Sequence, residues 1–171
     1  SNGRKQNQSV RNALTLALLT GLFSADIRNM TSDSLQKDES GEYYLRALRY
    51  NKSLGIPKEV GDWLTKIIDH NNNNKLLFPN ASGKALSDAT LSKALEGYKP
   101  SNGQEHFVVQ SFKKILGTFC FEEMTVNGFS EHVIERTLLL RKQTYENDSL
   151  KDTRAVLTWW LKYLENLGLK L

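Results

Sequence analysis

The chain is short of the residues that build disulfides, metal centres and membrane spans. It has one cysteine, Cys120, which excludes an internal disulfide and fits a reducing compartment. Its three histidines do not share metal-ligand spacing, so we expect no metal site. The longest apolar run, ALTLALLTGLF, is too short to cross a bilayer, and no signal peptide is visible. We therefore expect a cytoplasmic protein with no membrane association and no cofactor.

The remaining composition is that of a globular domain with a weak positive balance. The 171 residues are 39% apolar and 25% charged, enough for one domain with a buried core. A formal net charge of +4 permits nucleic-acid binding but does not by itself indicate it. Residues 1–8 are polar and are expected to be disordered or left over from cloning. Cys120 lies in the apolar string GTFCFEEM, where we expect a buried thiol rather than a nucleophile.

Helical periodicity covers most of the chain. Apolar residues recur every three or four positions, and Ser24, Ser87, Ser130 and Ser149 precede such segments as N-cap residues. Gly21 and Asn127-Gly128 act as stop signals. These signals predict helices over residues 10–22, 24–30, 57–70, 87–97, 107–124, from 130 onward, and 149–167.

A short central segment has a different pattern. The sequence EYYLRALRY, residues 42–50, alternates and carries aromatic side chains, as a half-buried strand does. Short strands near 34–36 and 54–56 are placed to pair with it, and residues 38–41 supply a turn. The predicted fold class is mainly α with a small three-stranded antiparallel sheet, in a single domain over residues 1–171.

The order of these elements, with two segments in particular, resembles the catalytic domain of tyrosine recombinases (the phage integrase family). In the first catalytic box of that family a helix ends at Thr-Gly-Leu, an arginine follows, and an acidic residue comes three positions later. Thr20, Gly21, Leu22 and Asp26 match this pattern, whereas Phe23 stands at the arginine position. Phe23 is expected to be a core residue that fills the space of an arginine. The later segment LLFPNASGKALSDATLSKAL resembles the stretch before the second box.

The second and third boxes are also altered. Gln110-Ser-Phe-Lys113 stands in place of His-x-x-Arg, and Leu140 ends the segment that resembles the third box, where the family has His or Trp. Tyr145 falls at the position of the nucleophile. The long helix of the second box and the closing segment NDSLKDTRAVLTWWLKYL are similar to integrases of the satellite-phage type. The resemblance runs from Val10 through almost the whole chain, although no catalytic motif is intact.

The resemblance implies a phosphoryl transfer in which a tyrosine oxygen attacks a DNA phosphodiester. Guanidinium groups would meet the charge on the non-bridging oxygens in bidentate fashion. Phe23 supplies no donor, and Lys113 keeps the charge but lacks the planar fork. Gln110 can donate a hydrogen bond but cannot relay a proton, and Leu140 can do neither. The cation that the family places in the sheet is Arg49 or Lys52, and the sequence does not decide between them.

The leading interpretation is a duplex-DNA-binding domain of an integrase-like recombinase from a mobile element, with impaired catalysis. The resemblance also implies a separate N-terminal DNA-binding domain, association with the bacterial nucleoid, and homo-oligomers on DNA through the closing helix. Two alternatives stay open. In one, the enzyme is active with Tyr145 as nucleophile and other cations at the phosphate, such as Arg28, Arg46 or Arg49. In the other, the domain is a helical protein-interaction module that no longer binds DNA. Candidate phosphate contacts, or else helix-end cations, are Lys114, Arg136, Arg141 and Lys142.

Overall fold

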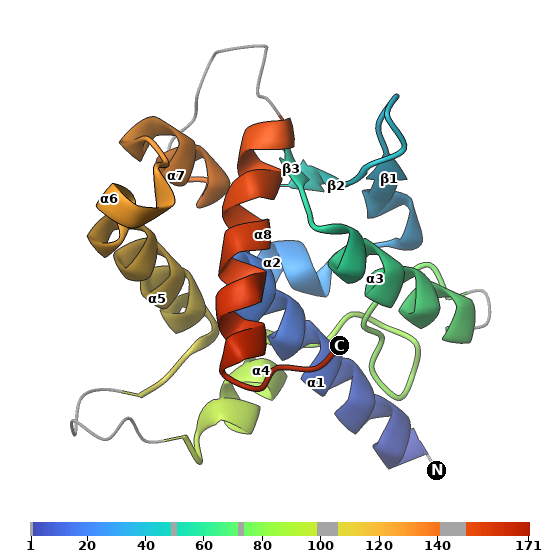
Figure 1. Cartoon of the computed structure of the whole chain (residues 1–171). Helices are drawn as coiled ribbons and strands as arrows, with labels where there is room; N and C mark the ends of the chain where they lie inside the picture. Colours follow the sequence, from blue (N-terminus) through green and yellow to red (C-terminus); the bar gives the residue numbers. More distant parts are fainter. Residues whose placement is uncertain (1, 49–50, 72–73, 99–105, 141–149) are drawn as a thin grey trace.

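The computed structural model describes residues 2–48, 51–71, 74–98, 106–140 and 150–171 (Figure 1). Two long helices, α1 and α8, lie side by side in the middle of the molecule. Helices α5, α6 and α7 lie on one side of this pair, and the sheet and α3 lie on the other. The helices are α1 (Asn2–Thr20), α2 (Ser24–Arg28), the 3-10 helix η1 (Ser32–Ser34), α3 (Lys58–His70), α4 (Asp88–Leu95), α5 (Val109–Glu122), α6 (Met124–Asn127), α7 (Glu131–Thr137) and α8 (Leu150–Asn166).

The predicted fold class is confirmed. Strands β1 (Leu35–Lys37), β2 (Tyr43–Leu48) and β3 (Lys52–Gly55) form an antiparallel sheet in the order β1-β2-β3. Leu45 of β2 is paired with Leu35 of β1 and with Leu54 of β3. Leu45 and Leu54 are fully buried, so one face of the sheet joins the core. Within the described residues, none of the helices has the length and apolar character needed to cross a lipid bilayer.

The N-terminal helix is longer than expected. It begins at Asn2, whereas the sequence predicted a start at residue 10. The segment NGRKQNQ contains Arg, Lys and Gln, which are good helix formers, and no proline, so a helix nucleated on the core continues outward. At the other end the prediction is correct, because the helix ends at Thr20 and Gly21 follows with a φ of 63°.

Helix α8 closes the core from the C-terminal side. The Trp160 side chain is only 2% exposed, and its indole N–H donates to the backbone oxygen of Leu18 at 2.8 Å. That oxygen belongs to the last turn of α1, where no further helical N–H is available to it. Trp159, the next residue on α8, is only half-buried and stacks on Phe119 at 5.1 Å between ring centroids. The two adjacent tryptophans therefore differ in burial, because they lie on different faces of α8.

Arg154 fastens α8 to the sheet. Its guanidinium donates to the backbone oxygens of Tyr43 at 3.0 Å and Ile56 at 3.3 Å, and to the Asp38 carboxylate at 3.1 Å. The Glu42 carboxylate lies 3.5 Å away. The Arg154 side chain is 14% exposed, so its charge is largely desolvated and its contacts are made within the protein. The turn between β1 and β2 is thereby held against the last helix.

The Asp38 carboxylate makes part of the stability pH-dependent. A hydrogen bond from the Glu42 backbone N–H, and then the Arg154 guanidinium, hold the pKa of Asp38 below its usual value of 3.8. Since the folded state prefers the ionised form, this contribution is complete above pH 3.8 and is lost as the pH falls through the lower folded pKa. We expect the native protein to exceed Asp38→Asn in unfolding free energy at pH 6, with the difference shrinking below pH 3.8. Urea titrations at several pH values measure it, and a difference constant down to pH 2.5 or so would contradict this linkage.

Candidate functional site

The turn after α1 sets the distance between α1 and α5. The Gly21 N–H donates to the Ala17 oxygen at 2.8 Å, and the residue adopts a φ of 63° that favours glycine. A Cβ atom at Gly21 would lie 3.2 Å from the Cα atom of Lys113 and 3.3 Å from a methyl group of Leu116. The glycine therefore lets the start of the first box approach the backbone of the second box closely.

Lys113 occupies the centre of this contact. It is only 6% exposed, and its ammonium group donates a hydrogen bond to the backbone oxygen of Leu138, just after α7. The same ammonium lies 4.2 Å from the centroid of the Phe23 ring, within cation–π range. Phe23 is half-buried and packs against the core, as expected, but its ring also receives this charge. The two residues that stand at family arginine positions are thus in contact with each other.

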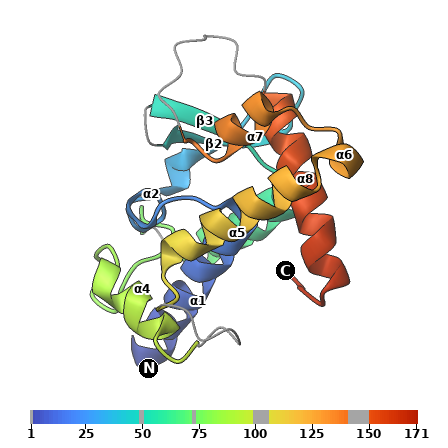
Figure 2. The ribbon, with the colours of Figure 1, turned by 90° about the vertical axis from the view of Figure 1, so that its left-hand side faces the viewer.

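Gln110 and Leu140 complete the group. Together with Lys113 and Lys114 they line a hollow of about 610 Å³ between α5 and the end of α7. Gln110 and Lys114 are exposed, and the Leu140 side chain is 47% exposed. Gln110 also lines a neighbouring hollow with Phe23. We call Phe23, Gln110, Lys113 and Leu140 the box cluster; two of its members, Gln110 and Lys113, belong to α5, the helix that lies toward the viewer in Figure 2.

Four of the predicted site residues lie outside the described residues. They are the candidate nucleophile Tyr145, the candidate phosphate contacts Arg141 and Lys142, and the candidate sheet cation Arg49. The other sheet candidate, Lys52, is the first residue of β3 and is 6% exposed. Strand β3 pairs with β2 and packs on α8.

Arg136 packs between α7 and α8. Its side chain is 10% exposed, lies 3.7 Å from the Asp152 carboxylate, and contacts the His132 ring nitrogen at 2.8 Å. Arg136 also lies in the last turn of α7, where a cation complements the helix dipole. These contacts favour the structural alternative for Arg136 over a phosphate contact, because little of the guanidinium reaches solvent.

The cations named for the active alternative differ in their surroundings. The Arg28 guanidinium donates to Ser24 at 3.0 Å and lies 4.0 Å from the Asp88 carboxylate, so it is held on α2 and α4. Arg46 is exposed on β2. The described surface near α5 and α7 also carries the exposed acids Glu122 and Glu131. The charge of this region is mixed rather than uniformly basic.

Cys120 is a buried thiol inside the core. Burial raises the pKa of the Cys120 thiol to about 12, so it stays protonated at neutral pH and is a poor nucleophile. In the part of the chain that the structure describes, no three His, Cys, Asp or Glu side chains gather as ligands for a metal ion.

Sequence reasoning missed two features of the site. The acceptor for Lys113 is a main-chain oxygen 25 positions away, which no residue type reveals. Arg154 links α8 to the sheet by hydrogen bonds. It lies in no recognisable sequence motif, and its acceptors are 98 to 116 positions away. Only the acidic turn containing Asp38 and Glu42 hinted that a cation would approach it.

Known proteins share this architecture without close sequence similarity. No protein-family model and no curated protein sequence matches the chain. The crystal structure of XerH site-specific recombinase bound to difH substrate, a pre-cleavage complex, is similar with a TM-score of 0.56 and 16% identity, over 96% of this chain and 50% of that one. The post-cleavage complex with palindromic difH substrate gives a TM-score of 0.54 and 15% identity, over 98% and 50%. The chain thus spans about half the length of these recombinase chains, and it has the fold of the tyrosine recombinase catalytic domain.

Proposed function

We propose that this domain binds duplex DNA as a recombinase-like module and that its strand-cleavage activity is impaired. The observation that carries the impairment is the position of Lys113. Its ammonium is buried, bonded to the Leu138 oxygen and set over the Phe23 ring. A charge held in this way serves the packing of α5 on α2 and α7 rather than a phosphate at the surface.

The chemistry supports the same conclusion. Losing one preorganised donor to a developing oxyanion typically costs about 3–4 kcal/mol of barrier. In the box cluster, Phe23 and Leu140 have no donor, and Gln110 offers one neutral amide that cannot transfer a proton. Several such losses together would slow cleavage by many orders of magnitude even if Tyr145 is well placed. The binding of DNA does not depend on these groups.

DNA binding is supported by the fold and by exposed cations near the box cluster. Both XerH structures are complexes with a DNA substrate. Lys114 is exposed at the hollow, and Lys151 is exposed at the start of α8. Arg141 and Lys142 stay candidate contacts in the segment between α7 and α8. Contacts of this type go to phosphates, so affinity should fall steeply with salt and depend little on sequence.

Two lysine variants separate the roles of neighbouring cations. Lys114→Met is expected to weaken binding to mixed-sequence duplexes. It should also reduce the slope of log K against log salt concentration by about one. Lys113→Met is expected to leave both quantities unchanged, because its charge does not reach the surface. Fluorescence anisotropy at 50 and 200 mM salt or thereabouts measures both. A Lys113→Met variant that folds but loses affinity would contradict the buried role of this lysine.

The impairment has its own readout, independent of affinity. Duplexes incubated with the protein are denatured and run on a gel that separates free DNA from protein-linked DNA. We expect salt-sensitive binding with no covalent adduct. An adduct that disappears in Tyr145→Phe would overturn the impairment and establish the active alternative. Absence of binding at both salt concentrations would overturn the DNA proposal for this domain and favour the protein-interaction module.

The role of α8 in oligomers is part of the same proposal. In this structure α8 packs on α1, α7 and β3 of its own chain. Association of copies through α8 on DNA, and relationship to the satellite-phage subgroup, are supported by the sequence resemblance. The size of the complex on duplexes of increasing length, measured by analytical ultracentrifugation, tests the association.

A further inference from the structure

A second hollow lies away from the box cluster. It has a volume of about 520 Å³ and is formed by the first half of α1, the second half of α3 and the loop from Asn74 to Gly83. In Figure 1, α3 and α5 lie on opposite sides of the α1–α8 pair, so this hollow and the box cluster are on different faces. A volume of this size suits a small organic ligand. No step of strand cleavage uses it.

The walls of the hollow are held by their own hydrogen bonds. The Asn71 amide donates to the Leu77 oxygen at 2.8 Å, and the Asn74 amide donates to the Gly83 oxygen at 3.2 Å. The Asn80 carboxamide oxygen accepts from two backbone N–H groups of the same loop. These amides are engaged in fixing the loop, so the shape of the hollow is set before any ligand arrives.

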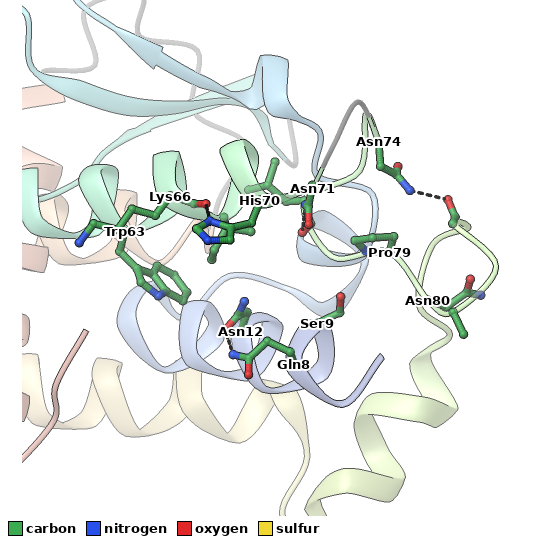
Figure 3. Close-up of a pocket in the computed structure, with 14 residues that line it drawn as sticks. Gln8, Ser9, Asn12, Trp63, Lys66, His70, Asn71, Asn74, Pro79 and Asn80 are labelled. Atoms are coloured by element: carbon green, nitrogen blue, oxygen red, sulfur yellow. Dashed lines mark hydrogen bonds between the residues drawn. The ribbon is translucent and has the colours of Figure 1, made fainter. Parts of the chain in front are cut away.

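Three polar residues of α1, Gln8, Ser9 and Asn12, line the hollow, and two of them form a donor–acceptor pair. The Gln8 amide N–H donates to the Asn12 carboxamide oxygen at 2.8 Å (Figure 3). This bond leaves the Gln8 oxygen as an acceptor and the Asn12 amide as a donor. Reversing both amides leaves one donor and one acceptor as well, so the pattern does not depend on their assignment. An adenine base presents the complementary pattern, the N6 amino donor beside the N7 acceptor, whereas guanine presents two acceptors there.

Helix α3 adds an aromatic surface and positive charge. Figure 3 shows the Trp63 indole and the His70 ring on α3 opposite Asn12 and Gln8 on α1. The Trp63 side chain is half-buried, so it offers part of its surface for stacking. His70 Nδ1 lies 2.6 Å from the Lys66 backbone oxygen, which can only accept, so Nδ1 carries a hydrogen that is engaged within α3. Lys66 lines the hollow too, and none of the described lining residues is Asp or Glu.

We propose that this hollow binds an adenine mononucleotide. The base stacks on Trp63 and pairs through N6 and N7 with the Gln8–Asn12 pair, and the phosphate is attracted by Lys66. The absence of carboxylates among the described lining residues favours an anionic ligand over a cationic one. The proposal is independent of the DNA-binding proposal, since the residues involved lie on another face.

Calorimetric titration of the intact chain with AMP tests it, with adenosine, GMP and inorganic phosphate as comparison ligands. We expect AMP to bind more tightly than any of the three. Trp63→Ala should weaken AMP about tenfold or more, because base stacking on the indole is lost. Lys66→Met should weaken AMP but leave adenosine unchanged. Asn12→Leu should reduce the preference for AMP over GMP.

Matched controls separate this site from the DNA surface. Lys114→Met, on α5, should leave AMP binding unchanged, and Lys66→Met should leave duplex binding unchanged. Trp63→Phe keeps an aromatic ring and serves if Trp63→Ala fails to fold. No heat with AMP at millimolar concentration, equal binding of AMP and phosphate, or equal AMP affinity in native protein and Lys66→Met would overturn the proposal. We expect a blunt-ended duplex to leave AMP bound; displacement of AMP by the duplex would overturn the separation of this site from the DNA surface.

Discussion

Replacing Gly55 by alanine is expected to lower the free energy of unfolding by about 4 kcal/mol or more, a loss in the exceptional range for one methyl group. A Cβ atom at Gly55 would lie 2.0 Å from the backbone oxygen of Leu150 and 3.1 Å from the Cβ atom of Arg154. The first of these neighbours is main chain at the start of α8, so no side-chain rotation relieves the overlap. Helix α8 must move away from β3.

That movement would break bonds that hold α8 on the sheet. The Gly55 N–H donates to the Thr153 hydroxyl at 2.9 Å, and Arg154 donates to the oxygens of Ile56 and Tyr43. Urea denaturation followed by circular dichroism measures the loss. Gly97→Ala is the matched control, because a Cβ atom there meets nothing within 4 Å, and we expect a change within about 0.5 kcal/mol. Equal stability of the two variants would show that α8 does not sit against β3 as described.

Trp160→Ala is expected to lower the unfolding free energy by about 3–5 kcal/mol. The substitution removes one of the largest fully buried side chains from the junction of α8 with α1 and α5. The ring contacts Phe119 at 5.6 Å and Tyr163 at 5.5 Å between centroids, so its removal leaves a cavity lined by aromatic rings. Thermal or urea unfolding monitored by far-ultraviolet circular dichroism gives the difference.

Two further variants divide that loss into its parts. Trp160→Phe keeps an aromatic ring but leaves the Leu18 oxygen without the indole N–H, which should cost about 1–3 kcal/mol. Trp159→Ala, at a half-buried position, should cost less than Trp160→Ala. If Trp159→Ala is the more damaging variant, the inward face of α8 has been assigned to the wrong tryptophan.

The elements were predictable wherever local rules decide them. Ser87 and Ser130 accept hydrogen bonds from the N–H groups of Thr90 and Val133, so both capping signals were read correctly. Gly21 has the positive φ that a helix stop requires. The start of α1 was predicted at residue 10 rather than Asn2 because the apolar periodicity begins there, although the polar residues before it favour helix.

The box cluster was predictable in membership but not in its contacts. Similarity to recombinase boxes named Phe23, Gln110, Lys113 and Leu140, and the structure brings them together. It did not show that Lys113 would turn inward, because its acceptor is a main-chain oxygen from another helix. Arg136 shows the same limit, since its partner Asp152 becomes close only when α7 packs on α8. Positions follow from sequence pattern, whereas partners follow from packing.

The hydrogen bonds between Arg154 and the sheet have a consequence for the synthesis of the protein. Strand β3 is an outer strand, and its last N–H and the following carbonyl find their partners only on α8, about 98 positions later. While the ribosome is still adding those residues, the outer edge of β3 is uncovered, and nascent chains can pair with one another along it. Covering of this edge therefore waits until residues near 154 have left the exit tunnel. A message truncated before that codon would yield a chain with every strand present and its sheet edge uncovered, a natural substrate for chaperones and proteases.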